Sequence, residues 1–226
     1  MQQASDLFNE EQRKQIEKAV SEAEGRTSCE IVPVVATASG RYDRPEDMVG
    51  LWLAVLAAVA VWFASPRTLN DSGNWDGQSW MVPVLIMVAG VVSAFIVGIV
   101  IGSRVGWLRR LFTPRQQMLD EVAARARETF FDKRIHHTSD ATGLLIYVSL
   151  FEHRAVVLGD QNVMDKLGQD FLDRLCQQLT TGFQQGNFVE TMCGVIANAG
   201  EELAGPLPRS SDDVNELEDS LILIDE

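Results

Sequence analysis

The chain has 226 residues, of which 46% are hydrophobic and 23% charged, and its formal net charge is −13. Because 32 acidic residues outweigh 19 basic ones, the surface repels phosphate backbones, and we expect no nucleic-acid partner. Cys29, Cys176 and Cys193 show no CxxC or other short spacing, which favours a reducing compartment over a disulfide scaffold.

The first forty residues predict one helix followed by one strand. Asn9-Glu10-Glu11-Gln12 resembles a capping box, and Ile16, Val20 and Ala23 would share one face of the helix that follows. The β-branched run 30–36 is typical of a short strand. Because Pro33 has no N–H to donate to a ladder, we expect this strand at a sheet edge or at a bulge.

Two long apolar runs come next along the chain. Residues 49–64 and 80–102 contain no Asp, Glu, Lys or Arg, and the second run has 23 residues. About 20 apolar residues suffice to cross the hydrocarbon core of a bilayer. The longer run therefore predicts a transmembrane span by itself, and the shorter one is interpreted as its partner in a two-helix hairpin. Both lie behind a charged N-terminal segment, so we expect no cleaved export signal.

The charges around the two runs predict their orientation. One arginine, Arg67, lies in the link between the runs, whereas six lie on the outer flanks: Arg41, Arg44, Arg104, Arg109, Arg110 and Arg115. By the positive-inside rule, both flanks and both termini are expected in the cytoplasm. Neither run carries an ionisable group, so we expect no transport or proton pathway.

Small residues recur at intervals of four along both runs: Gly50, Ala54 and Ala58 on the first, and Gly90, Ala94, Gly98 and Gly102 on the second. Such stripes let helix backbones approach closely. They favour packing of the two legs on each other, with homo-oligomerisation or a membrane-protein partner as the alternatives.

Beyond the hairpin the pattern predicts a helix and then two strands. Thr113-Pro114 is typical of a helix start, and Leu119, Val122, Ala126 and Phe130 would form its apolar stripe. The apolar runs 144–149 and 155–158 predict strands joined by a short turn.

Two more helices and a tail complete the chain. One helix is expected from about Val163, and a second, begun by Asn187, is expected to stop at Gly205-Pro206. The tail after Pro208 is acidic and ends in the apolar run 221–224, so we expect it to be solvated, with an end able to dock on a partner. Since the soluble piece before the hairpin has only about 40 residues, we infer one α/β sandwich assembled from both flanks.

Several short stretches resemble the TPM-domain family. They are Thr27-Ser28-Cys29-Glu30-Ile31, the run 142–149, Gly159-Asp160-Gln161-Asn162 and Asn215-Glu216-Leu217. The resemblance covers roughly residues 7–41 and 113–217 and implies an α/β/α sandwich. It divides the chain into an N-terminal part of the TPM domain (1–44), a transmembrane hairpin (49–104), the remainder of the domain (111–206) and an acidic tail (207–226).

The same resemblance carries functional expectations. Members of the family are linked to acid phosphatase activity, divalent-metal binding and the support of membrane-protein complexes. Bacterial members with a membrane hairpin often accompany LemA-type membrane proteins, which implies a bacterial inner membrane as the location.

Four residues are candidates for chemistry. Asp160 lies where a strand leads into a helix, a common place for ligands in α/β sheets. Asp165 lies three residues after Asn162, so these two could form a helix cap; alternatively, Asp160, Asp165 and Glu30 could share a divalent cation such as Ca or Mg. Arg134 could contact a phosphate, or it could be part of a solvated loop with the adjacent histidines.

Three functional hypotheses follow. The first is a membrane-anchored TPM domain that binds or helps assemble another membrane protein. The second is a metal-assisted phosphomonoester hydrolase in which Asp160 and Arg134 act at the phosphate. The third is a purely structural tether. No catalytic sequence motif decides among them.

Overall fold

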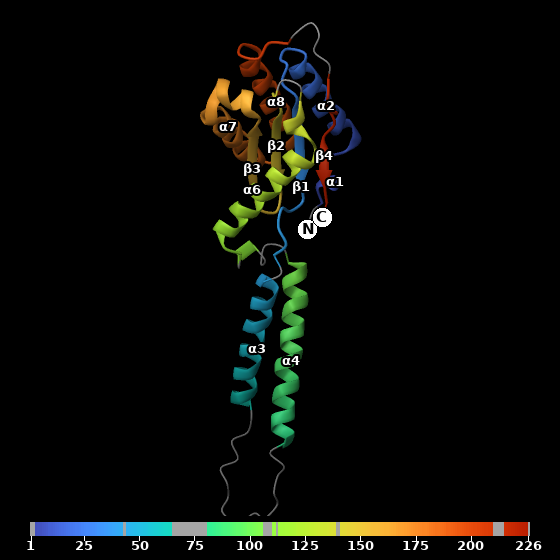
Figure 1. Ribbon diagram of the computed structural model, residues 1–226. Coiled ribbons are helices and arrows are strands. Elements are labelled where there is room, and N and C mark those ends of the chain that lie inside the picture. The colour runs from blue at the N-terminus through green and yellow to red at the C-terminus, as the bar shows by residue number, and fades with distance from the viewer. Residues whose placement is uncertain are drawn as a thin grey trace, which may run out of the picture. The chain divides into compact units, whose positions relative to one another are not determined.

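In the computed structural model the described residues are 3–42, 44–64, 81–105, 110–111, 113–138, 141–209 and 215–225. The chain forms two compact units (Figure 1). The first combines residues 1–40 with residues 115–226, and the second comprises residues 41–114. The first unit is therefore built from both ends of the chain, with the second inserted between its parts.

A four-stranded mixed sheet forms the centre of the first unit. Its strands are β1 (Ile31–Ala36), β2 (Leu144–Ser149), β3 (Arg154–Gly159) and β4 (Ile222–Ile224). They lie in the order β3-β2-β1-β4. β1 pairs in parallel with β2 and β4, whereas β2 and β3 are antiparallel.

Helices cover both faces of this sheet, because alternate strand residues point to opposite sides. Ile31 and Val35 pack with one set of helices, and Val32 and Val34 with the other. The first face carries α1 (Ala4–Leu7), α2 (Glu10–Glu24), α7 (Gln161–Gln184) and α8 (Phe188–Ala204). The second carries α6 (Arg115–Asp132) and the short helix η1 (Ile135–His137). The predicted α/β sandwich is confirmed.

Local signals that predicted the helices have mixed outcomes. The capping box of α2 forms, with Gln12 N–H donating to Asn9 Oδ1 at 2.8 Å and Asn9 N–H donating to Gln12 Oε1 at 2.9 Å. In α6, Leu119 is 39% exposed although its stripe was expected to be buried. α7 bends at Gly168, whose φ of 74° is in the left-handed region.

The expectation that the strand with Pro33 lies at an edge or a bulge is wrong, because β1 is paired on both sides. Leu144 N–H donates to Glu30 O, so even-numbered main-chain groups of β1 face β2. Odd-numbered groups, including Pro33, face β4. Pairing with β4 begins only at Val34, so the missing N–H of Pro33 costs no ladder bond.

The expectation of a solvated tail that docks on a partner is wrong for its apolar end. Residues 222–224 form β4, and Thr37 N–H donates to Ile224 O at 2.8 Å. Leu221 is buried in the core. The apolar end of the tail therefore binds the sheet of its own chain.

The second unit is a pair of apolar helices, α3 (Arg44–Ala64) and α4 (Met81–Arg104). They pack closely where two glycines meet: a Cβ on Gly98 would lie 2.6 Å from Gly50 Cα. The predicted packing of the two small-residue stripes on each other is confirmed at this point. Arg67 and Arg109 of the orientation argument lie outside the described residues.

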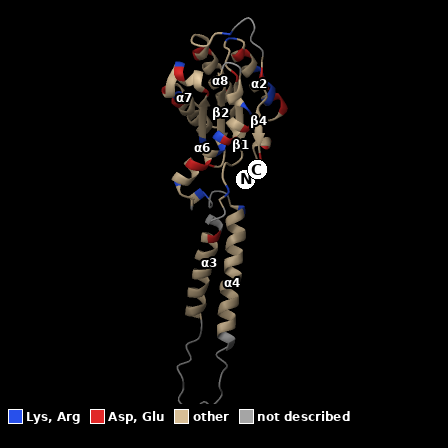
Figure 2. Ribbon diagram, in the orientation of Figure 1, with Lys and Arg blue, Asp and Glu red and all other residues tan. Residues whose placement is uncertain are grey.

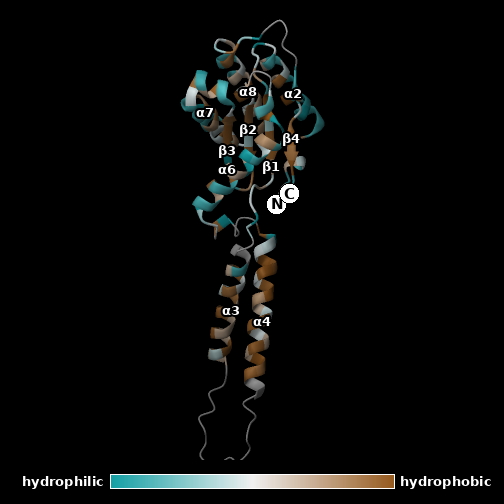
Figure 3. Ribbon diagram, viewed as in Figure 1, coloured by the Kyte–Doolittle hydropathy of each residue, from teal (hydrophilic) through white to brown (hydrophobic). Residues whose placement is uncertain are grey.

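Both helices are long and apolar enough to cross a membrane. The candidate spans are Asp47–Ala64, with mean hydropathy 2.0, and Val84–Arg104, with mean hydropathy 3.0. Only 17% and 6% of these spans are buried. Apolar residues follow both helices in Figure 3, and charged residues gather instead on the helices of the first unit in Figure 2.

Candidate functional site

Glu30, Gly143 and Asp160 form a row across one edge of the sheet. Glu30 immediately precedes β1, Gly143 precedes β2, and Asp160 follows β3. Leu144 N–H donates to Glu30 O and Asp160 N–H donates to Gly143 O, both at 2.8 Å. Because β3 is antiparallel, Asp160 lies at the amino ends of the parallel strands, opposite the carboxyl edge where such sheets commonly bind ligands.

Further carboxyl groups surround Glu30. Its own side chain is buried, and its Oε1 accepts from Glu216 N–H at 3.2 Å. Glu24, at the end of α2, accepts from Ile31 N–H at 2.8 Å. Burial raises the pKa of Glu24 from 4.5 to about 8, the Ile31 bond opposes this, and the nearby Glu30 and Asp219 carboxyls raise the pKa further. At neutral pH Glu24 therefore carries a proton.

The buried thiol of Cys29 lies among these acids. It donates to Thr142 O at 2.6 Å. Burial raises the thiol pKa well above its ordinary value, and the charges of Glu24, Glu30 and Asp160 add to the shift. Cys29 is thus an unreactive thiol at neutral pH.

Asp160 is the N-cap of α7. Its Oδ1 accepts from Gln161 N–H at 2.7 Å, so the helix cap is Asp160 and the expected cap formed by Asn162 and Asp165 is wrong, because Asn162 already lies inside the helix. Its Oδ2 is buried and finds no hydrogen-bond partner among the described residues. Asp165 lies one turn further along α7 and is exposed.

Arg134 occupies the turn between α6 and η1, with φ of 57°, and its side chain is exposed. The next residue, Ile135, packs against Gly143: a Cβ on Gly143 would lie 2.1 Å from Ile135 O. Only a glycine fits this contact. The main chain of Arg134 is thereby held near the row of Glu30 and Asp160.

The predicted divalent-cation site can be compared with this geometry. A hard cation needs several oxygen ligands converging on one point. Across the described parts of the chain, no group of three or more His, Cys, Asp or Glu side chains is placed to hold a metal ion. Glu30 and Asp160 lie along the same edge, but they do not form such a site with Asp165.

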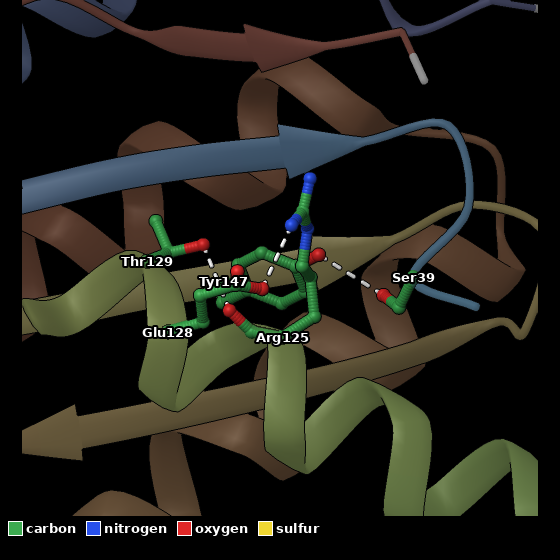
Figure 4. A network of polar contacts seen from close by, with 5 residues as sticks. All are labelled: Ser39, Arg125, Glu128, Thr129 and Tyr147. Atoms are coloured by element: carbon green, nitrogen blue, oxygen red, sulfur yellow. Dashed lines mark hydrogen bonds and ion pairs between the residues drawn. The ribbon is translucent and has the colours of Figure 1, made fainter. Parts of the chain in front are cut away.

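A second polar cluster lies at the opposite end of the strands, where sequence analysis identified no candidate. The Oγ of Ser39 lies 3.0 Å from the Tyr147 hydroxyl (Figure 4). It also donates to Ser149 Oγ at 2.9 Å. The buried Glu152 carboxylate accepts from Ser39 N–H at 2.9 Å and from the Ser149 hydroxyl. On α6, Arg125 pairs with Glu128 at 2.7 Å. Burial raises the pKa of Tyr147, and the Ser39 hydrogen bond opposes that shift.

Sequence reasoning missed Glu24 and Asp219, the two further acidic residues near Glu30. Glu24 was not singled out from the sequence, and Asp219 belonged to the tail that was expected to be solvated. The available signal was helical spacing, because Glu24 continues the series Ile16, Val20 by four residues and so faces the core. At the second cluster, the signal was two hydroxyl residues, Tyr147 and Ser149, within an otherwise apolar strand.

The fold defines the class of protein: an α/β sandwich with a mixed sheet, interrupted by two apolar helices. It is similar to the NMR structure of the BA42 protein from the psychrophilic bacterium Bizionia argentinensis, with a TM-score of 0.57 and 20% sequence identity. The match covers 95% of this chain and 94% of that one. No protein-family model and no curated protein matches the chain. At this identity the likeness shows the fold alone.

Proposed function

We propose that the chain is a membrane-anchored interaction module of the TPM type that binds or helps assemble another membrane protein. The observation that supports this most is the helix pair of α3 and α4. Their small residues are used against each other, and large apolar residues such as Trp52, Leu56 and Ile96 are left exposed. In a bilayer those side chains are available to lipid or to a neighbouring span.

The orientation of this module follows from its arginines. With six on the outer flanks and one in the link, both termini and the α/β unit are cytoplasmic, and the link crosses to the other side. The bacterial inner membrane is the proposed location, and a LemA-type membrane protein is the proposed kind of partner.

A photo-crosslinking experiment tests the proposal at residue level. A benzoylphenylalanine side chain replaces Leu56, which is 59% exposed, or Ala54, which is 7% exposed, in the full chain at native expression. We expect irradiation of the Leu56 variant to yield a discrete adduct with one integral membrane protein. The Ala54 variant is the matched control, because its probe faces α4 and should give no intermolecular adduct.

The outcome that contradicts the proposal is equally specific. If positions around the exposed face of α3 and α4 give only lipid adducts, the helix pair serves as an anchor and the structural-tether hypothesis is favoured. An unrelated two-span hairpin that replaces the pair and carries the probe at the position matching Leu56 should give no such adduct while leaving the protein in the membrane.

The alternative is a divalent-metal-assisted phosphomonoester hydrolase. The buried Oδ2 of Asp160, which has no hydrogen-bond partner in the described structure, and the nearby Glu30 support it. It predicts hydrolysis of p-nitrophenyl phosphate that requires added Mg²⁺ or Ca²⁺ and that Asp160→Asn abolishes without lowering Tm. Absence of turnover with either ion would leave the interaction module as the better hypothesis.

A further inference from the structure

The tail segment 215–221 lies at the amino end of β1, just before the chain enters β4. Its Glu216 N–H donates to Glu30 Oε1 at 3.2 Å. Leu217 packs with the core on the α6 side of the sheet, and Leu221 is buried in the core on the other side. The segment therefore contacts both faces of the sheet and covers the end of β1 where Glu30 lies.

The contact between Glu24 and Asp219 joins this segment to α2 through two carboxyl groups. Asp219 Oδ1 accepts from Asn215 Nδ2, and Glu24 Oε1 accepts from Ile31 N–H at 2.8 Å. The two carboxyls are also hydrogen-bonded to each other. Because an ionised carboxyl group can only accept hydrogen bonds, one of them must carry a proton. Burial assigns that proton to Glu24 by raising its pKa to about 8.

The charges around Glu24 oppose its ionisation. The titratable groups near this end of α2 come from the segment before β1, from the tail and from α8: Cys29, Glu30, Asp219, and Arg26 paired with Glu201. Cys29 is a neutral thiol, and the charge of Arg26 is matched by its partner at 3.4 Å. If Glu24 loses its proton, the docked tail brings neighbouring carboxylates together with no proton between them, and docking weakens.

The other end of the tail is held by different bonds. Asp225 accepts from Ser5 N–H at 3.1 Å and from Thr37 Oγ1 at 3.0 Å. These bonds lower the pKa of Asp225, so its carboxylate is retained as the pH rises. Thr37 N–H donates to Ile224 O at 2.8 Å, a main-chain bond that does not titrate. β4 can therefore stay paired with β1 while the segment before it detaches.

We propose that segment 215–221 is a proton-controlled strap: the proton between Glu24 and Asp219 holds it on the sheet, and loss of that proton releases it while β4 remains paired. Release exposes Glu24 and Glu30, so the surface of this edge of the sheet changes with pH. The strap involves neither α3 and α4 nor any turnover, so its test is separate from the tests of the proposed function.

The direction of the pH dependence follows from the docked form. The docked segment keeps the Glu24 proton up to about pH 8, whereas a detached segment leaves Glu24 near its ordinary pKa of 4.5. Docking is therefore complete at low pH. Between these two values the docking equilibrium should fall by up to about tenfold per pH unit.

A distance between two spin labels gives a direct test. Nitroxides are attached at Ser21→Cys on α2 and at Glu218→Cys in the tail, both exposed positions, in the full chain in nonionic detergent. Cys176 and Cys193 are replaced by alanine, and the buried Cys29 is left in place. We expect one narrow distribution of distances at pH 6 and a second, broad population that grows as the pH is raised to 9.

Glu24→Gln is the decisive variant, because glutamine donates to Asp219 and accepts from Ile31 N–H at every pH. It should keep the narrow distribution at pH 9. Glu22→Gln is the matched control: Glu22 is exposed on the same helix and pairs with Lys18 at 3.6 Å, so this variant should open as wild type does.

Hydrogen exchange at Thr37 shows whether β4 stays in place. The protection of its N–H, taken relative to the exchange rate of an unfolded chain at the same pH, should be equal at pH 6 and pH 9. Loss of this protection at pH 9 would show that β4 leaves with the segment, which overturns the proposed strap.

Two results of the distance measurement would also overturn the proposal. A wild-type distribution that is the same at pH 6 and pH 9, whether narrow or broad, would mean that no strap responds to protons. Opening of Glu24→Gln to the same extent as wild type would assign the pH dependence to another group.

Discussion

Two carboxyl groups hold the C-terminal tail, and their surroundings drive their pKa values in opposite directions. At one end, burial raises the pKa of Glu24, which is hydrogen-bonded to Asp219 of the tail. At the other end, Asp225 accepts from Ser5 N–H and Thr37 Oγ1, and these bonds lower its pKa. The surroundings therefore favour the protonated form of Glu24 and the carboxylate form of Asp225.

Glu24→Gln should change the pH dependence of stability. In the folded chain Glu24 keeps its proton up to about pH 8, whereas an unfolded Glu releases it near 4.5. The stability associated with this proton is complete below pH 4.5 and falls as the pH rises to about 8, by up to about 1.4 kcal/mol per pH unit. Glutamine keeps the Ile31 bond without this loss. We therefore expect the Tm of the variant, relative to wild type, to rise between about pH 5 and pH 9, and a constant difference would contradict the raised pKa.

Gly143→Ala tests the contact that brings the Arg134 turn to the sheet. The added Cβ would overlap Ile135 O, which is main chain and cannot move aside cheaply. We expect the free energy of unfolding to fall by about 3 kcal/mol or more, measured by denaturant titration. Gly194→Ala is the control, because its Cβ meets nothing within 4 Å and its helical position should give roughly 0.5–1 kcal/mol of stabilisation.

At the scale of elements, the sequence predicted the helices and strands that local patterns encode. It missed the strand that forms only by pairing with a distant part of the chain. Helix α2 and strands β1, β2 and β3 were found from capping residues and apolar runs. β4 was missed because its three residues follow an acidic stretch, and only β1, far earlier in the chain, makes them a strand. The strand with Pro33 was wrongly expected at an edge for the same reason, because the strand β4 that covers the outer side of β1 was not predicted. Among the acidic residues at the amino ends of β1 and β2, the sequence identified Glu30 and Asp160. Glu24 and Asp219 were missed, because the contact between them forms only when the tail docks on the sheet.

Removing residues 215–226 should expose one side of β1. The amides of Val35 and Thr37 face β4, whereas that of Val34 faces β2. By hydrogen exchange, we expect Val35 and Thr37 to lose protection in the truncated chain while Val34 keeps it. Continued protection at Thr37 would show that β4 is not its partner, and loss at Val34 would show that the tail is needed for the sheet as a whole.

At the scale of the whole molecule, the inserted helix pair separates strands that must pair. β1 lies before the insertion and β2 after it, so Ile31 pairs with Leu144 across the whole of the inserted segment. Neither flank contains a complete sheet, because β1 comes from one flank and the other three strands come from the second. Both flanks must therefore be on the same side of a membrane for the unit to form, which an even number of spans provides.

Because both flanks must lie on the same side of the membrane, the membrane topology of the chain tests the fold as well as the location. With Cys29, Cys176 and Cys193 replaced by alanine, a single cysteine is placed at Ser72 in the link or at Ser220 in the tail. We expect a membrane-impermeant maleimide to label Ser72→Cys in intact cells and Ser220→Cys only after the membrane is permeabilised, because six arginines hold the flanks inside. Labelling of both positions from outside would contradict the two-span arrangement. Labelling of Ser220→Cys alone in intact cells would show that the helix pair has the opposite orientation. The asymmetry of the arginines would then not determine the topology.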